Sequence, residues 1–296
     1  MNKLILTTAI IFTTITATFA QVSGNQVFDR NNNSRNVQKG GVTKLYLSDS
    51  AFIVQAKVLK NVKADYYIAA FGLSQEAATV TGGNTQINAR IKSFIDNIKK
   101  SGINEQDIYT DMIAQYRVYD LKRNVRNAIA EYLKGYELSK NVIVKYNKPA
   151  QIEQLLTLAS RDSIFDLIKV DYMVDDVSRV YDELFQAATE VIKKKKDLYV
   201  KLTSANILPE AQIYGEEFIS YYPDGMYRNY KAFSSNFYES YSGENERKEA
   251  MKKFETFYYD KIDYSGFDKI INPSVLEPVV EFGLTLQVKY NIKPAR

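Results

Sequence analysis

The spacing of apolar residues changes several times between residues 63 and 146, and this order constrains the fold more than any other feature. Residues 62–73 are rich in Tyr, Ile and Phe, which favours a β-strand. Residues 84–100 then follow a helical period, and Asn84 or Thr85 is the expected N-cap. The apolar residues on the predicted face are Ile87, Ile91, Phe94, Ile95 and Ile98. A Ser-Gly pair ends this helix, and two strands follow at 108–118 and 136–146.

The rest of the chain continues the mixture of many strands with few helices. Pro149 is expected to open a short helix, and a second long helix starts near Asp176 or Ser178. The apolar stripe predicted for that helix is Val180, Leu184, Ala188, Val191, Lys195, Leu198 and Leu202. Strict alternation over residues 280–290 predicts a strand with one buried and one solvated face, so Glu281 should be exposed to solvent. The pattern predicts an α+β fold, with antiparallel sheets on which two long helices and one short helix pack.

The first twenty residues have the composition of a secretory signal peptide. Lys3 precedes a short, Thr-containing apolar run, and Thr18-Phe19-Ala20 supplies small residues for cleavage before Gln21. The alternative is an uncleaved membrane anchor, although the run is short for a bilayer of about 30 Å. The sequence predicts a flexible leader over residues 21–42 and a folded domain over residues 43–292. We therefore expect an exported protein with no transmembrane span after cleavage.

The absence of histidine and cysteine narrows the chemistry open to the chain. It excludes Ser-His-Asp and Cys-His nucleophilic catalysis and the usual zinc sites, which leaves carboxylate, Lys or Tyr chemistry. Adjacent carboxylates at 175–176 and 216–217 do not suit a glycosidase, because neighbours on a strand point to opposite faces. We predict no catalytic site, cofactor or metal. The net charge of +4, without a clustered basic face, argues against a nucleic-acid partner.

Residues 218–267 are unusually aromatic, with 15 of the 38 Tyr and Phe residues of the chain. Tyrosine is common at interfaces, because its ring buries apolar area while its hydroxyl stays wet. This segment is therefore a candidate surface for a partner, a glycan or a second copy; alternatively, it is an insertion whose aromatic side chains pack on the sheet. The candidate interaction residues are Tyr221, Tyr222, Tyr227, Tyr230, Phe237, Tyr238 and Tyr241. The Lys run at 193–196 reads as a solvated helix surface rather than a site for anionic lipid or polysaccharide.

An ordered set of short motifs resembles the SIMPL-domain family. Gly102-Ile103 leads to Asp107-Ile108-Tyr109-Thr110, which is similar to that family's Gly-Ile and Asp-Ile-x-Thr elements. Gly135-Tyr136 then opens a strand, as the family's Gly-Tyr motif does, and Asn272-Pro273 precedes the final strand. The resemblance covers about 45–215 and 270–292, and residues 218–267 match poorly.

This resemblance implies an envelope protein rather than an enzyme. The family includes periplasmic immunogenic proteins and an oxidative-stress defence protein of Gram-negative bacteria, and some of its members form ring-like oligomers. It therefore suggests a periplasmic or outer-membrane-associated protein that self-associates, linked to envelope or oxidative-stress tolerance. A glycan- or ligand-binding module that uses the aromatic segment and a carboxylate hydrolase are the alternatives.

Overall fold

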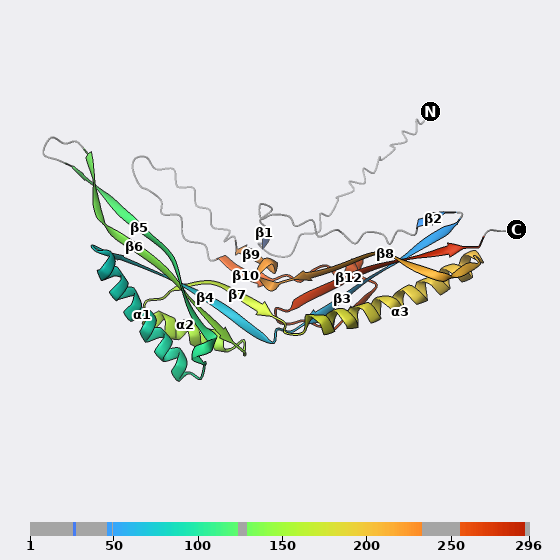
Figure 1. Cartoon of the computed structure of the whole chain (residues 1–296), viewed down its shortest axis with the longest axis horizontal. Helices are drawn as coiled ribbons and strands as arrows, with labels where there is room; N and C mark the ends of the chain where they lie inside the picture. Colours follow the sequence, from blue (N-terminus) through green and yellow to red (C-terminus); the bar gives the residue numbers. More distant parts are fainter. Residues whose placement is uncertain (1–25, 28–45, 49, 124–128, 233–254, 294–296) are drawn as a thin grey trace, which may run out of the picture. The chain divides into compact units, whose positions relative to one another are not determined.

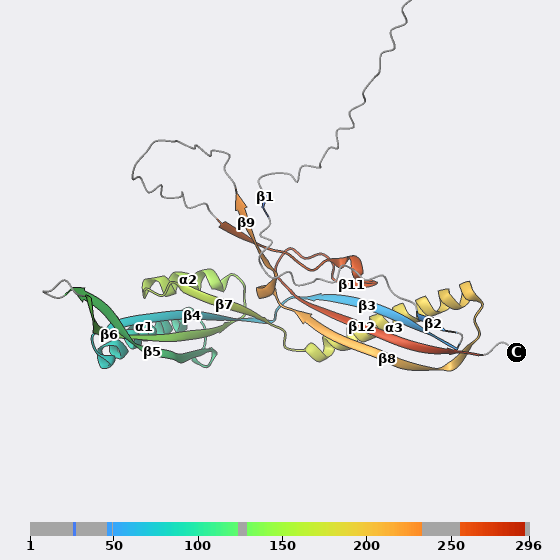
Figure 2. The ribbon, with the colours of Figure 1, turned by 90° about the horizontal axis from the view of Figure 1, so that it is seen from above.

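A computed structural model describes residues 26–27, 46–48, 50–123, 129–232 and 255–293 (Figure 1). The chain divides into two compact units. One unit combines 1–34 with 228–258, and the other combines 35–227 with 259–296. Two sheets and three α-helices of the described chain belong to the larger unit (Figure 2). The predicted signal peptide and most of the predicted leader lie outside the described residues.

The first sheet of the larger unit is antiparallel and carries two helices on one face. Its strand order is β5 (Ile108–Arg123), β6 (Ile129–Tyr146), β4 (Tyr66–Ala77), β7 (Asp166–Met173). The helices are α1 (Val80–Lys100) and α2 (Gln151–Arg161). Alternate residues of β4 and β6 meet the apolar stripe of α1, and the Phe71 and Phe94 rings lie edge to face at 5.4 Å. The predicted helical stripe of α1 is therefore confirmed as core.

The start of α1 differs from the prediction. Thr79 is the N-cap, and its hydroxyl accepts a hydrogen bond from the Gly82 N–H at 3.1 Å. Gly83, which precedes the predicted start of the helix, is a buried helical residue. A Cβ there would stand 2.5 Å from Cδ1 of Leu138. The helix thus begins a turn early, because glycine allows it to approach β6 closely. Its end follows the prediction, with Gly102 at a left-handed φ of 96°.

The second sheet has β3 and β12 at its centre and one long helix on one face. Its strands are β2 (Tyr46–Ser48), β3 (Ala51–Val62), β8 (Ile207–Tyr221), β11 (Lys269–Ile271) and β12 (Val280–Ile292). Pairing is antiparallel except between β11 and β3, which run parallel. Helix α3 (Val177–Thr203) starts at the N-cap Asp176, as predicted. The architecture is α+β with helices packed on sheets.

The apolar stripe predicted for α3 is wrong at its C-terminal end, at Leu198 and Leu202. The buried residues of this helix are Val180, Leu184, Ala187, Ala188 and Ile192. Leu198 and Leu202, by contrast, are 55% and 82% exposed. The half-buried Tyr199 and Val200 pack against the core in their place. A helical period fits both sets, so spacing alone could not choose between them.

The expected wet face of β12 is buried at its beginning. Glu281 is fully buried and Gly283 is buried, although both belong to the predicted polar face. A small cluster of Leu59, Met226 and Ile262, with half-buried Tyr259 and other aromatics, packs on this face of the sheet. The strand therefore has apolar neighbours on both faces there, and the prediction for Glu281 is wrong.

The described part of residues 218–267 is mostly regular. After β8 come the 3-10 turn η2 (Pro223–Met226), β9 (Tyr227–Ala232), β10 (Glu255–Tyr259) and the 3-10 turn η3 (Tyr264–Gly266). Strands β9 and β10 join β1 (Gln26–Val27) in a three-stranded sheet of order β1-β9-β10. The short 3-10 turn η1 (Glu105–Asp107) precedes β5. No helix of the described residues is both long and apolar enough to cross a bilayer.

Candidate functional site

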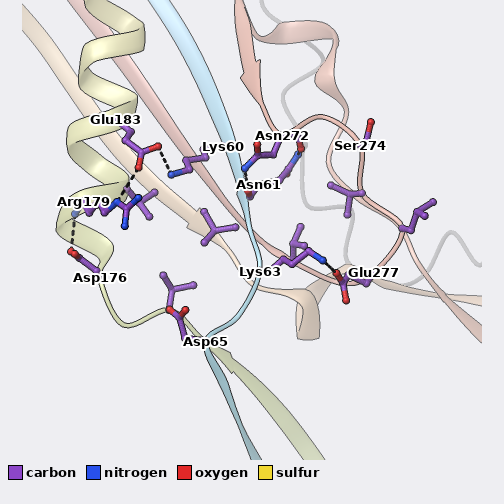
Figure 3. A pocket seen from close by; sticks show the side chains of 16 residues that line it. Lys60, Asn61, Lys63, Asp65, Asp176, Arg179, Glu183, Asn272, Ser274 and Glu277 are labelled. Atoms are coloured by element: carbon purple, nitrogen blue, oxygen red, sulfur yellow. Dashed lines mark hydrogen bonds and ion pairs between the residues drawn. The ribbon is translucent and has the colours of Figure 1, made fainter. Parts of the chain in front are cut away.

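A cavity of about 540 Å³ opens beside the last residues of β3 (Figure 3). Its walls are the end of β3, the first two turns of α3 and the segment 272–279 that leads into β12. Valines from all three walls, together with Leu276, supply the apolar part of the lining. Polar side chains converge on the same space, a combination that is typical of small-molecule sites.

A chain of charged contacts crosses one wall of the cavity. The Lys60 ammonium lies 2.6 Å from Oε2 of Glu183, and Arg179 Nε lies 3.3 Å from Oε1 of the same carboxylate. The Lys60 side chain is only 12% exposed. The hydrogen bond from Lys60, followed by the charges of Lys60 and Arg179, lowers the pKa of Glu183. Glu183 is therefore an ionised carboxylate that pairs with two cations. A general acid would need a raised pKa instead.

A second set of charges lies along the rest of the cavity lining. Lys63 pairs with Glu277 from the 272–279 segment, and this hydrogen bond raises the pKa of Lys63. Asp65 accepts a hydrogen bond from the Asp175 N–H at 2.9 Å, and Asp176 caps α3 through the Arg179 N–H at 2.9 Å. The carboxylates are thus held by backbone donors and cations. This arrangement can bind a polar ligand.

Asn61 joins the cavity wall to the centre of the second sheet. Its Nδ2 donates to the Asn272 carbonyl at 2.8 Å, and Asn272 Nδ2 donates back to the Asn61 carbonyl at 3.2 Å. Asn272 has a left-handed φ of 57°. Asn61 Nδ2 also donates to the Tyr264 hydroxyl at 2.7 Å. The register places Asn61 directly opposite the buried Glu281.

The aromatic residues predicted as an interaction surface do not form one cluster in the described chain. Tyr221 is half-buried against the cluster of Leu59, Met226 and Ile262. Tyr222 and Tyr227 are 43% and 44% exposed. Tyr230 lies in β9. The other three predicted residues, Phe237, Tyr238 and Tyr241, lie outside the described residues.

A second exposed surface, which the sequence interpretation missed, lies on the β5–β6 hairpin. Residues 120–131, which lie between the strands predicted at 108–118 and 136–146, belong largely to the two strands themselves, which extend to Arg123 and from Ile129. Nine large apolar or aromatic side chains on this hairpin are 45–66% exposed. They are Tyr109, Met112, Ile113, Tyr116, Tyr119, Leu121, Ile129, Tyr132 and Leu133. The available signal was the density of Tyr, Ile and Leu among the charges of that segment.

The comparison with protein families agrees with the family that the sequence motifs resemble. The model of the SIMPL family, described as a protein of unknown function (DUF541), matches residues 53–253. The chain belongs to the SIMPL family. The match includes residues 216–253, which the motif comparison left out, and it ends before the predicted correspondence at 270–292. No curated protein matches the chain.

Proposed function

We propose that this chain is an exported, non-enzymatic SIMPL protein of the cell envelope that self-associates through its β5–β6 hairpin. The observation that carries the proposal is the group of nine exposed apolar and aromatic side chains on that hairpin, which occupy both of its faces because strand neighbours such as Tyr132 and Leu133 point to opposite sides. Isolated exposed apolar residues are ordinary, whereas a concentrated set is typical of an interaction surface. Burial of such side chains contributes about 25 cal/mol per Å² of apolar area.

The position of β5 in its sheet supports the same proposal. Among the described strands β5 pairs only with β6, so its outer edge is not covered by a further strand. The strand has 16 residues. Long edge strands with apolar side chains invite pairing with another chain unless charges, proline or bulges prevent it. Register shifts near Met112 and Val118 twist this edge. Such irregularities oppose simple edge pairing, so contacts between the exposed side chains of two hairpins, rather than a continuous sheet, carry the proposal.

The proposal is tested by the mass of the protein in solution. We expect the protein expressed with its natural N-terminus to be cleaved before Gln21 and to elute as an assembly in size-exclusion chromatography with light scattering. Tyr116→Lys with Leu121→Lys should shift it to the mass of one chain, whereas Gln115→Lys, an exposed polar position of the same strand, should not. A wild-type monomer at micromolar concentration would refute self-association, and uncleaved protein in the cytoplasm would refute export.

The second candidate is ligand binding, and two observations support it. The cavity beside β3 has a volume within the range of about 300–1,000 Å³ common for small-molecule sites. Tyr222 and Tyr227 are exposed, as stacking on a glycan requires. Binding lost in Tyr227→Ala or Tyr230→Ala would favour the glycan, and binding lost in Lys63→Met would favour the cavity. The link to envelope and oxidative-stress tolerance rests on the family resemblance, and sensitivity of a deletion strain to peroxide tests it.

A further inference from the structure

Two buried polar side chains face each other on adjacent strands of the second sheet. Glu281 of β12 is fully buried and Asn61 of β3 is 3% exposed. The antiparallel register pairs these two residues directly. Direct cross-strand neighbours have Cβ atoms about 4.5–5.5 Å apart and point to the same face of the sheet. Their face is the one opposite α3, since the alternate residues Val280 and Phe282 pack with that helix.

In the hydrogen-bond network around this pair, two side-chain oxygen atoms have no partner. Asn61 Nδ2 uses its two hydrogens on the Tyr264 hydroxyl and the Asn272 carbonyl. Glu281 Oε2 accepts from the Ile262 N–H at 3.2 Å. Asn61 Oδ1 and Glu281 Oε1 are both buried without a hydrogen-bond partner. Two unpaired acceptors on facing side chains are costly in a buried site, and a hydrogen between them would satisfy both.

We propose that Glu281 is a neutral carboxylic acid that donates its proton from Oε1 to Asn61 Oδ1, and that this proton latches the wall of the cavity beside β3. The acid thereby sets the orientation of the Asn61 amide. With Oδ1 turned to Glu281, Nδ2 must point to Tyr264 and Asn272, which are its observed partners. Asn272 begins the 272–279 segment that forms one cavity wall.

A proton explains the pair better than a metal cation does. Calcium takes about 6–8 oxygen ligands and magnesium about six. The pair offers two unpaired oxygens, and no group of three or more carboxylates converges anywhere among the described residues. Nor do the residues that line the cavity include Glu281.

The surroundings favour the neutral acid. Burial, the largest effect, raises the pKa of Glu281, and the nearby Asp260 raises it further, while the Ile262 N–H and Lys261 lower it. Burial, the largest effect, also raises the pKa of Tyr259 and Tyr264, which pack on the same face, so both phenols are neutral near pH 7 and add no charge beside Glu281. Burial disfavours the charged form of an acid, and Lys261 alone does not reverse this.

Loss of the proton should release the latch. A carboxylate at Glu281 is an acceptor only, so the Asn61 amide gains by rotating to donate Nδ2 to it. The rotation removes the hydrogen bonds from Nδ2 to the Tyr264 hydroxyl and to the Asn272 carbonyl. Because the folded pKa is raised, the stabilisation is complete below the unfolded pKa and is lost as pH rises through the folded pKa. The cavity wall is therefore held in acid and loosened in base.

The test compares the full-length protein with Glu281→Gln, whose amide can donate to Asn61 at every pH. Between pH 5 and 8 the wild-type unfolding equilibrium constant should rise by up to tenfold per pH unit relative to Glu281→Gln, until the folded pKa is passed. Amide hydrogen exchange at 274–277 should accelerate with pH in the wild type beyond its rate in Glu281→Gln. The chain has no histidine, so few other groups titrate in this window.

Carboxyl ¹³C NMR of the wild type gives an independent reading that does not depend on a variant that folds. A Glu281 signal that stays in its protonated position above pH 6 supports the proposal. An ionised Glu281 at pH 5, or identical pH profiles for wild type and Glu281→Gln, would overturn it. Stabilisation by added Na⁺, K⁺ or Ca²⁺ in the wild type, absent from Glu281→Gln, would assign the two oxygens to a cation and would also overturn it.

Discussion

Lys195 occupies the third position of the lysine run on α3, and replacing it with methionine tests how differently neighbouring lysines contribute. Its ammonium lies 2.6 Å from Oδ1 of Asp268 and donates to the Gln55 carbonyl at 2.8 Å. The Lys195 and Asp268 side chains are only 17% and 20% exposed. The same Asp268 carboxylate accepts from the Lys57 N–H at 2.8 Å. This pair joins α3 to β3 and to the residue before β11.

The expected loss follows from what Lys195→Met leaves behind. Breaking a fully buried ion pair costs about 3–5 kcal/mol, because one charge stays buried without its partner. Asp268 keeps one backbone donor and some contact with water, so we place the loss at about 2–3 kcal/mol of unfolding free energy. Methionine retains the apolar stem of the lysine, so little of this loss is packing.

Urea denaturation followed by the helical circular dichroism signal measures the effect. Lys194→Met is the matched control, because Lys194 is the preceding residue in the run and is exposed. It should change the unfolding free energy by less than about 0.5 kcal/mol. Equal effects of the two substitutions, or a Lys195→Met variant within about 0.5 kcal/mol of wild type, would show that the run is a uniform solvated surface and would refute the assignment.

Three further substitutions test the fold around the candidate surfaces. Phe94→Ala should lower the unfolding free energy by about 3–5 kcal/mol, because the ring is fully buried against Phe71. Leu156→Ala, at an exposed position of α2, is the control and should not cause such a loss. Chemical denaturation measures both variants. Asp176→Ala should cost about 1 kcal/mol by removing the N-cap of α3, while Asp176→Asn should restore most of it; equal losses would contradict capping. Gly135→Ala should destabilise the folded protein by about 1–3 kcal/mol, because the added Cβ would stand 2.5 Å from the Ala77 carbonyl oxygen. An unchanged melting temperature would show that the backbone shifts to accommodate the methyl group.

The elements that the sequence predicts well are those in which one face alone is buried. The stripe of α1 and the alternation of β6 meet a single layer each, so hydrophobic period and burial agree. In α3 two overlapping apolar stripes exist, and contact with the sheet selects the one that includes Ile192. The N-cap of α1 was missed because a glycine pair looks like a loop until Leu138 requires the close approach.

Most of the candidate site could not be predicted from the sequence, because the site depends on pairs of residues that are distant in the chain. Lys60 and Glu183 are 123 residues apart, and Asn61 and Asn272 are 211 apart. No local period connects them. Glu281 looked solvent-facing because the alternation of β12 predicts which residues share a face, but it does not predict whether a second layer covers that face. Met226 and residues 259–267 supply that layer, and the aromatic content of 259–267 was the available signal.

Burial raises the pKa of Glu281 above its ordinary value, in a chain whose composition includes no group that usually titrates near neutral pH. Without histidine, no side chain has an ordinary pKa close to 7. Desolvation raises the pKa of a carboxyl from its ordinary acidic value, and Glu281 is fully buried. If Glu281 served only to satisfy Asn61, glutamine would do so equally in acid and better at neutral pH, where it carries no charge to be buried. Glu281→Gln should therefore match the wild type near pH 4 and exceed it in unfolding free energy by up to about 1.4 kcal/mol for each pH unit by which the two pKa values of Glu281 differ. Equal stability of the two proteins at pH 8 would mean that the carboxyl titrates as it does in the unfolded chain, and that the buried pair is structural alone.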